Sequence, residues 1–258
     1  MSVIPVVEAI EEVSVDSDDY SSLSLTELLL KDGQKVDSLV RQESEQASLI
    51  PRFLGIALTS FAVFSLALAT LLSLVPAENL PVFLKEAWLR NPGRAGVSLG
   101  LAYTIGLVAA TGVCLPSFYF YGLLSGVRIT VLQVTTHIMQ GMAATSLMLM
   151  GLLPIYVAYV LGMIVFRAPS ASLLPMIYVG LLLPFIAGLW GLRTIYRGFM
   201  QLADTLAPER RCRRQCFLRR LTLACTACYS AVTPVMIYTL WQNISASNWW
   251  DIFPGGLF

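Results

Sequence analysis

Residues 192–220 read LRTIYRGFMQLADTLAPERRCRRQCFLRR, a basic stretch that lies between two apolar runs. It holds eight of the seventeen Lys and Arg residues in the chain. The cytosolic loops of membrane proteins carry an excess of Lys and Arg. We therefore predict that residues 193–220 form a basic cytosolic loop between two membrane-spanning segments.

The composition of the whole chain is that of an integral membrane protein. Hydrophobic residues make up 56% of it and charged residues only 13%, against about 25% charged residues in soluble domains. The apolar residues form runs of roughly twenty or more, the length at which a helix crosses a hydrocarbon core of about 30 Å. The sequence predicts an all-α, polytopic membrane helix bundle within residues 51–242. Its five predicted spans are residues 53–75, 96–121, 131–160, 173–192 and 221–241.

The third apolar run, from Val131 to Phe166, is longer than a bilayer requires. As one helix it would be about 54 Å long, at a rise of about 1.5 Å per residue. Pro154 lies inside it, and a proline in a helix interior kinks or ends the helix. Two predictions stay open here: one kinked helix, or a span followed by an interfacial helix.

The distribution of basic residues predicts the orientation of the bundle. Five spans place the two termini on opposite sides of the membrane. With the N-terminus in the cytosol, thirteen of the seventeen Lys and Arg residues fall on cytosolic segments. This is the direction of the positive-inside rule, so we expect the N-terminus inside and the C-terminus outside.

The N-terminal fifty residues divide into two cytosolic segments. Residues 1–23 are acidic and serine-rich, with little to bury, and are predicted to be a disordered tail. Residues 24–50 are predicted to form an amphipathic helix, or two short ones, and a linker, because apolar residues recur after eleven positions and so share one helix face. That helix either lies on the membrane or on the protein's own loops, or docks a cytosolic partner. The residues of this face are Leu25, Leu28, Leu29, Val36, Leu39 and Val40.

Two segments are predicted to contact the outer interface of the membrane. Residues 80–90, LPVFLKEAWLR, can form a short interfacial helix, and we expect Phe83, Leu84 and Trp88 to face lipid. Residues 243–258 form an exterior tail with two tryptophans, and tryptophan is enriched at headgroup depth.

A polar group of residues opens the third run and is the main candidate for a functional site. On a helix, Gln133, His137 and Gln140 share one face, with Thr136 beside them. Polar groups in a bilayer must find a partner or lose free energy, and they often mark function. No predicted span contains Asp or Glu, so a proton relay would lack its second member. We predict an interhelical hydrogen bond or an interfacial contact; a ligand or proton site is the alternative.

The basic loop predicts contact with anionic lipid headgroups, at about 1 kcal/mol per residue near the surface. Nucleic acid is not an expected partner, because residues 210–220 are tethered to a membrane and have no interleaved aromatic residues beyond Phe217. The residues expected to contact lipid or a protein partner are Arg210, Arg211, Arg213, Arg214, Arg219 and Arg220.

Small residues four apart in sequence allow two helices to approach closely. We expect such packing at Gly96, Gly100, Gly122 and Gly126.

The five cysteines do not predict a cofactor site. Cys212 and Cys216 lie among arginines, and Cys225 and Cys228 lie inside an apolar run. Four thiols within this stretch could bind Zn²⁺, but we predict packing roles for them; lipidation of Cys212 or Cys216 is a further alternative. We expect no metal, no cofactor and no catalytic residues. A redox or metal protein remains a third hypothesis.

The stretch CLPSFYFYGLLSGVRITVLQVTTHIMQGMAATSLMLMGLLPI, Cys114–Ile155, resembles prokaryotic multi-span membrane proteins that look like distant relatives of the Yip family. The shared features are a proline and aromatics that end one span, a Gly-rich turn with one Arg, and a polar start to the next span. The stretch GLWGLRTIYRGFMQLA, Gly188–Ala203, adds to the resemblance. It implies five spans, a cytosolic N-terminal region and no catalytic residues. The signature of the eukaryotic members, which are associated with membrane trafficking and small GTPases, has no clear counterpart here.

These features lead us to expect a non-enzymatic membrane scaffold or accessory subunit, with a protein partner or a second copy of itself. Its tail and basic loop would contact that partner or anionic lipid. The alternative is a transporter or channel component with a polar site around His137. From the resemblance we expect a multi-pass protein of the bacterial inner membrane.

Overall fold

The computed structural model describes residues 22–31, 33–76, 79–124, 130–203 and 208–246 of the 258-residue chain. The regular structure in these residues is entirely helical, as predicted. Most of the predicted acidic tail and of the predicted aromatic tail lies outside them. The helices are α1 (Ser22–Lys31), α2 (Gly33–Arg41), α3 (Glu43–Leu74), α4 (Val82–Arg90), α5 (Pro92–Leu124), α6 (Val131–Val165), α7 (Ser170–Ala203) and α8 (Pro208–Ala246).

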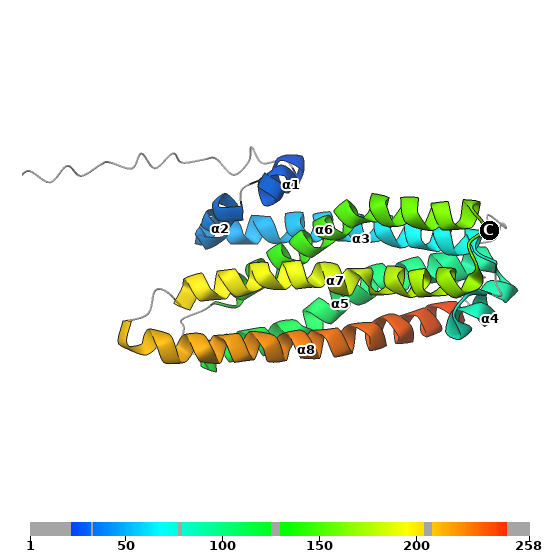
Figure 1. Ribbon diagram of the computed structural model, residues 1–258. Helices are drawn as coiled ribbons and strands as arrows, with labels where there is room; N and C mark the ends of the chain where they lie inside the picture. Colours follow the sequence, from blue (N-terminus) through cyan, green and yellow to red (C-terminus); the bar gives the residue numbers. More distant parts are fainter. Residues whose placement is uncertain (1–21, 32, 77–78, 125–129, 204–207, 247–258) are drawn as a thin grey trace, which may run out of the picture.

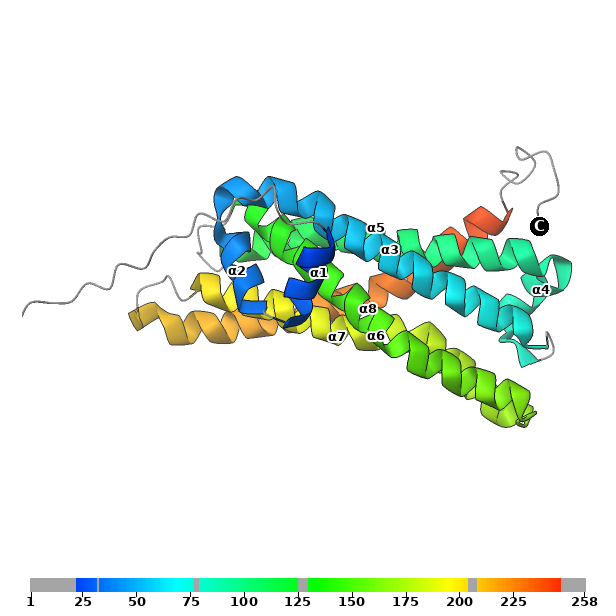
Figure 2. The same ribbon diagram turned by 90° about the horizontal axis from the view of Figure 1, so that it is seen from above.

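The five long helices lie side by side and alternate in direction along the chain (Figure 1). Helices α3, α6 and α8 run from the end near α2 toward the end near α4, and α5 and α7 run back. Helix α6 packs on α3 and α7, and α5 packs on α3 and α8. The N-terminal helices and the end of α8 therefore lie at opposite ends of the bundle (Figures 1 and 2).

Four stretches of the described chain are long and apolar enough to cross a membrane. They correspond to the first four predicted spans, which supports the prediction of a multi-pass membrane protein. The fifth predicted span lies within α8, which runs alongside the other four helices (Figure 1). The four stretches are Ser44–Leu74, Pro92–Phe120, Val131–Val165 and Ser172–Gly198.

Two helices begin earlier than the predicted spans. Helix α3 begins at Glu43 and continues through Pro51. A proline removes only one helical hydrogen bond, and the side chains of Leu49 and Phe53 are buried on either side of it. Helix α5 begins at Pro92 because the Asn91 side chain caps it, accepting a hydrogen bond from the Arg94 N–H at 3.0 Å.

The long third run forms one continuous helix, α6, which passes through Pro154 and ends at Val165. Of the two open predictions for this run, the structure has the single helix. Its 35 residues make it about 52 Å long, and Figure 1 shows that it changes direction partway along.

The short helix α4 packs against the bundle in a different orientation from the predicted one. Leu84 and Trp88, expected to face lipid, are buried against the bundle. They lie one turn apart, so they share one face of α4. Phe83 is 43% exposed on another face, and its ring meets that of Trp241 edge-on, with centroids 6.4 Å apart.

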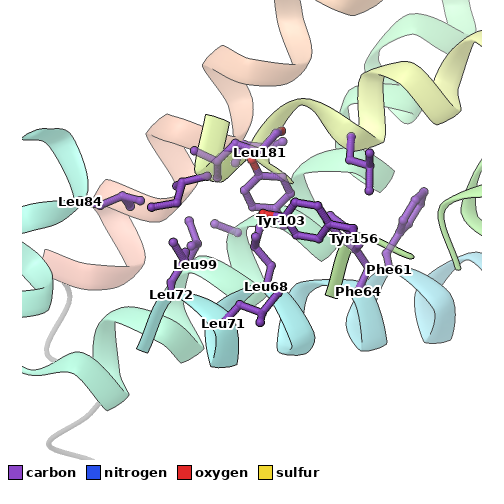
Figure 3. Packing of buried hydrophobic residues seen from close by; sticks show 14 of the residues in the cluster. Phe61, Phe64, Leu68, Leu71, Leu72, Leu84, Leu99, Tyr103, Tyr156 and Leu181 are labelled. Carbon is purple, nitrogen blue, oxygen red and sulfur yellow. The ribbon is translucent and has the colours of Figure 1, made fainter. Parts of the chain in front are cut away.

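The core contains two tyrosines whose hydroxyls reach the backbone of α7 (Figure 3). The Tyr103 hydroxyl of α5 donates to the Leu181 carbonyl at 3.0 Å. The Tyr156 hydroxyl of α6 donates to the Met176 carbonyl at 3.1 Å. A Cβ at Gly180 would overlap the Tyr156 hydroxyl, so glycine is needed there for the tyrosine to reach α7.

Candidate functional site

The N-terminal segment forms two short helices, α1 and α2, that fold back onto the bundle (Figures 1 and 2). Leu25, Val36 and Val40 are at most 1% exposed. They pack in one cluster with side chains of α3 and with Ala143 of α6. Isolated helices of this length are marginal in water, so packing on α3 and α6 holds them in place. The apolar face predicted from the sequence is thus covered by the same chain.

Gln133, the first residue of the predicted polar site, belongs to the start of α6. Its backbone N–H donates to the Thr130 hydroxyl, and its side-chain oxygen accepts from the Thr130 N–H, both at 3.2 Å. This is a capping box, which satisfies the free donors at a helix start. Gln133 is therefore engaged in the helix cap.

The other three residues of the predicted site are buried: Thr136, His137 and Gln140 are 0%, 3% and 2% exposed. The Thr136 hydroxyl donates to the Leu132 carbonyl one turn earlier, at 2.8 Å. The Gln140 amide donates to a carboxylate oxygen of Asp37 in α2, also at 2.8 Å. An acid is thus present at this polar site, although it comes from α2 and not from a predicted span.

His137 lies against α7. A Cβ at Gly198 would be 2.7 Å from His137 Nδ1, so the imidazole sits directly over the Gly198 backbone. Gly141 lies one turn of α6 beyond His137. A Cβ added at Gly141 would be 2.5 Å from the side chain of Ile195 in α7. A Cβ at Gly191 would overlap both Thr145 and the Gly141 carbonyl. These glycines let α6 and α7 approach closely around the polar site.

Two of the four glycines predicted for packing lie on α5 facing α3. The Cβ position of Gly96 is 3.5 Å from Ala69 Cβ, and that of Gly100 is 3.7 Å from Ser65 Cβ. The structure does not describe what surrounds Gly122, and Gly126 lies outside the described part of the chain. Closer glycine contacts, between α6 and α7 and between Gly106 of α5 and Ile237 of α8, were missed because a glycine's spacing on one helix does not identify the partner helix.

A pocket of about 70 Å³ lies between α3, α5, α6, α7 and α8. Most of its lining is apolar, with the hydroxyls of Thr111, Thr145 and Tyr229 among the exceptions. A cavity of about 150 Å³ is known to hold benzene. The smaller space here suits a slender group or a few waters more than a ring-sized substrate.

Basic residues mark the end of the bundle that carries α1 and α2. Arg193, Arg197 and Arg220 are exposed there, and the Arg193 guanidinium lies 5.6 Å from the centre of the Trp190 ring. Helix α8 begins beyond the ends of the other long helices (Figures 1 and 2). Its first turns carry Arg210, Arg211, Arg213, Arg214 and Arg219, whose side chains lie outside the described part.

The described residues contain no group of three or more His, Cys, Asp or Glu side chains placed to hold a metal ion. Cys114 is a buried free thiol on α5 and Cys228 an exposed free thiol on α8. The side chains of Cys212, Cys216 and Cys225 are outside the described set.

Neither a family model, nor a curated protein, nor a solved structure matches this chain.

Proposed function

We propose that the chain is a non-enzymatic integral membrane scaffold or accessory subunit that binds anionic lipid headgroups or a protein partner through its basic end. In this proposal it crosses the bacterial cytoplasmic membrane five times, with the N-terminus inside and the C-terminus outside. The observation that carries it is the placement of exposed Arg193, Arg197 and Arg220 at the end of the bundle to which α1 and α2 are folded.

The chemistry of this end favours an anionic partner. The sequence has no Asp or Glu between residues 87 and 203, so no acid on α5, α6 or α7 offsets the arginines of α7. Each basic residue near an anionic surface contributes about 1 kcal/mol, and the attraction is screened by salt within about 10 Å at 0.1 M. Helix α8, whose first turns contain Arg210, Arg211, Arg213 and Arg214 in sequence, begins beyond the ends of the other long helices (Figure 1).

Reconstitution in bilayers with equal amounts of anionic and zwitterionic phospholipid tests the lipid contact. The variant Arg210→Gln, Arg211→Gln, Arg213→Gln, Arg214→Gln should lose most of the excess of anionic lipid that the wild type retains on mild extraction. Replacing Arg90 at the opposite end by Gln is the control and should leave the excess unchanged. An unchanged excess in the fourfold variant, or a change in its insertion direction alone, would show that the basic segment is a topology signal only.

The scaffold part of the proposal has its own test. A protein that co-purifies with the full chain in fixed stoichiometry should be lost when residues 1–46 are deleted. Recovery of the same stoichiometric complex without these residues would place the partner surface elsewhere on the bundle.

A second candidate is a transporter or channel component, and the contact between Asp37 and Gln140 favours it. It brings a carboxylate to the buried helix face that also carries His137, one turn away. In this case His137→Ala would abolish flux in liposomes. Flux equal to that of the wild type would remove this candidate.

A further inference from the structure

The pocket described above is partly open, and its exposed lining residues belong to α7 and α8. Its floor is formed by side chains that are buried, such as Phe61, Thr111 and Met142. Its exposed lining residues are Leu189 of α7, 63% exposed, and Ser230 of α8. Helices α7 and α8 pack less closely with each other than each does with its other neighbour. In a membrane, this opening faces the lipid.

The lining of the pocket extends along α7. On α7 its lining runs from Phe185 to Ile195, which at about 1.5 Å per residue is about 15 Å along the helix axis. That is half of a hydrocarbon core of about 30 Å. Gly188 contributes to the space, because no atom lies within 4 Å of the position of a Cβ on it. We call this space between residues 185–195 of α7 and Tyr229–Ser230 of α8 the α7–α8 groove.

Positive charge lies at one end of the α7–α8 groove. Leu189, an exposed lining residue, lies four and eight residues before Arg193 and Arg197, so the three share one face of α7, and both arginines are exposed. On α8, Arg220 is also exposed and precedes the exposed lining residue Ser230 by ten residues, about 15 Å along the helix. Arginine presents a fork of donors that matches a phosphate group. The groove thus has an apolar length in the core of the membrane and guanidinium groups at headgroup depth.

From this juxtaposition we infer that the α7–α8 groove binds one anionic phospholipid, with an acyl chain along α7 and the phosphate at Arg193, Arg197 and Arg220. A lipid chain suits this groove, since it is slender, apolar and present at that depth in every membrane, and only part of it needs to enter the pocket of about 70 Å³. The inference deepens the proposed lipid contact and rests on it for the sign of the headgroup charge.

Native mass spectrometry of the full chain, extracted from bilayers of equal anionic and zwitterionic phospholipid, tests the inference. The wild type should retain one anionic phospholipid. Gly188→Phe fills the groove from α7 and should lower that retention at least tenfold. The matched control is Gly151→Phe, at another glycine with open space around its Cβ position but on α6, and it should retain lipid like the wild type. Arg193→Gln with Arg197→Gln should abolish the preference for anionic over zwitterionic lipid.

The outcomes separate this site from the proposed surface contact. Wild-type retention in Gly188→Phe, combined with a lost anionic preference in the fourfold Arg210–Arg214 variant, would overturn the groove and leave the surface contact standing. Loss of the lipid in Gly188→Phe alone would leave the groove standing without the surface contact.

Photolabelling of the wild-type protein tests the same inference without any substitution. A phospholipid with a photoreactive group midway along its acyl chain should label residues 185–195 or Tyr229–Ser230. Labelling confined to the exposed face of α6 at Ile155 and Tyr159 would overturn the inference.

Discussion

Gly191→Ala is the substitution for which the structure makes the sharpest prediction. An added methyl group on α7 would overlap the Thr145 hydroxyl and the Gly141 carbonyl of α6. The threonine side chain can rotate away, but the carbonyl belongs to the α6 backbone. The substitution therefore forces the two helices apart along the contact that encloses the polar site.

The size of the effect follows from two opposing contributions. Overpacking of a tightly packed core costs about 1–3 kcal/mol. Replacing glycine by alanine within a helix otherwise gains about 0.5–1 kcal/mol, because glycine loses more backbone entropy on folding. Gly151→Ala on α6 has only the gain, since no atom lies within 4 Å of its Cβ position. Because the gain is common to both, the two alanine variants should differ in free energy of unfolding by the overpacking cost, about 1–3 kcal/mol.

The free energy of unfolding can be measured for both variants by titrating the protein in mixed micelles with a denaturing detergent. Gly191→Ala should unfold at a lower detergent fraction than the wild type, and Gly151→Ala at the same fraction or a higher one. If Gly191→Ala is as stable as Gly151→Ala, then α6 and α7 do not approach closely at Gly141 and Gly191, and the close α6–α7 contact around the polar site is contradicted.

Two further predictions concern buried hydrogen bonds. Tyr103→Phe removes the hydrogen bond from α5 to the α7 backbone and should lower the free energy of unfolding by about 0.5–1.5 kcal/mol in the same titration. The control Tyr238→Phe, at an exposed residue, should be nearly neutral, and equal costs for the two variants would contradict the buried hydrogen bond. Gln140→Leu removes the amide that donates to the Asp37 carboxylate and should speed hydrogen exchange in α2 several-fold. Gln242→Leu at the far end of α8 is the control, and unchanged exchange in α2 of the Gln140→Leu variant would show that this hydrogen bond does not hold the helix.

Much of the architecture could be predicted because it depends on the local pattern of residues. Runs of apolar residues place the first four membrane helices, and the apolar pattern of the N-terminal segment correctly predicts that Leu25 of α1 and Val36 and Val40 of α2 are buried. The boundaries were less predictable, because burial outweighs the single hydrogen bond that a proline removes. Helix α3 therefore passes through Pro51, and α6 passes through Pro154.

The candidate site could be predicted only in part, for a related reason. Spacing on one helix identifies a shared face but not its partners. Gln133 has the right spacing, yet it lies at the helix start, where the free backbone donors need a cap. Asp37 lies 103 residues from Gln140, and no pattern within α6 indicates it. The contact between Gly198 and His137 depends in the same way on how α7 packs.

The central claim is that five helices cross the membrane with the arginine-rich end in the cytosol, and site-directed labelling tests it most directly. In a chain whose native cysteines are replaced by serine, Thr205→Cys, Glu78→Cys and Ser247→Cys can be labelled one at a time with a membrane-impermeant maleimide. Labelling of Thr205→Cys only in inverted vesicles, and of the other two only in intact cells, is the predicted result. If Ser247→Cys is labelled from the same side as Thr205→Cys, α8 does not cross; if Thr205→Cys is labelled in intact cells, the basic end is not cytosolic.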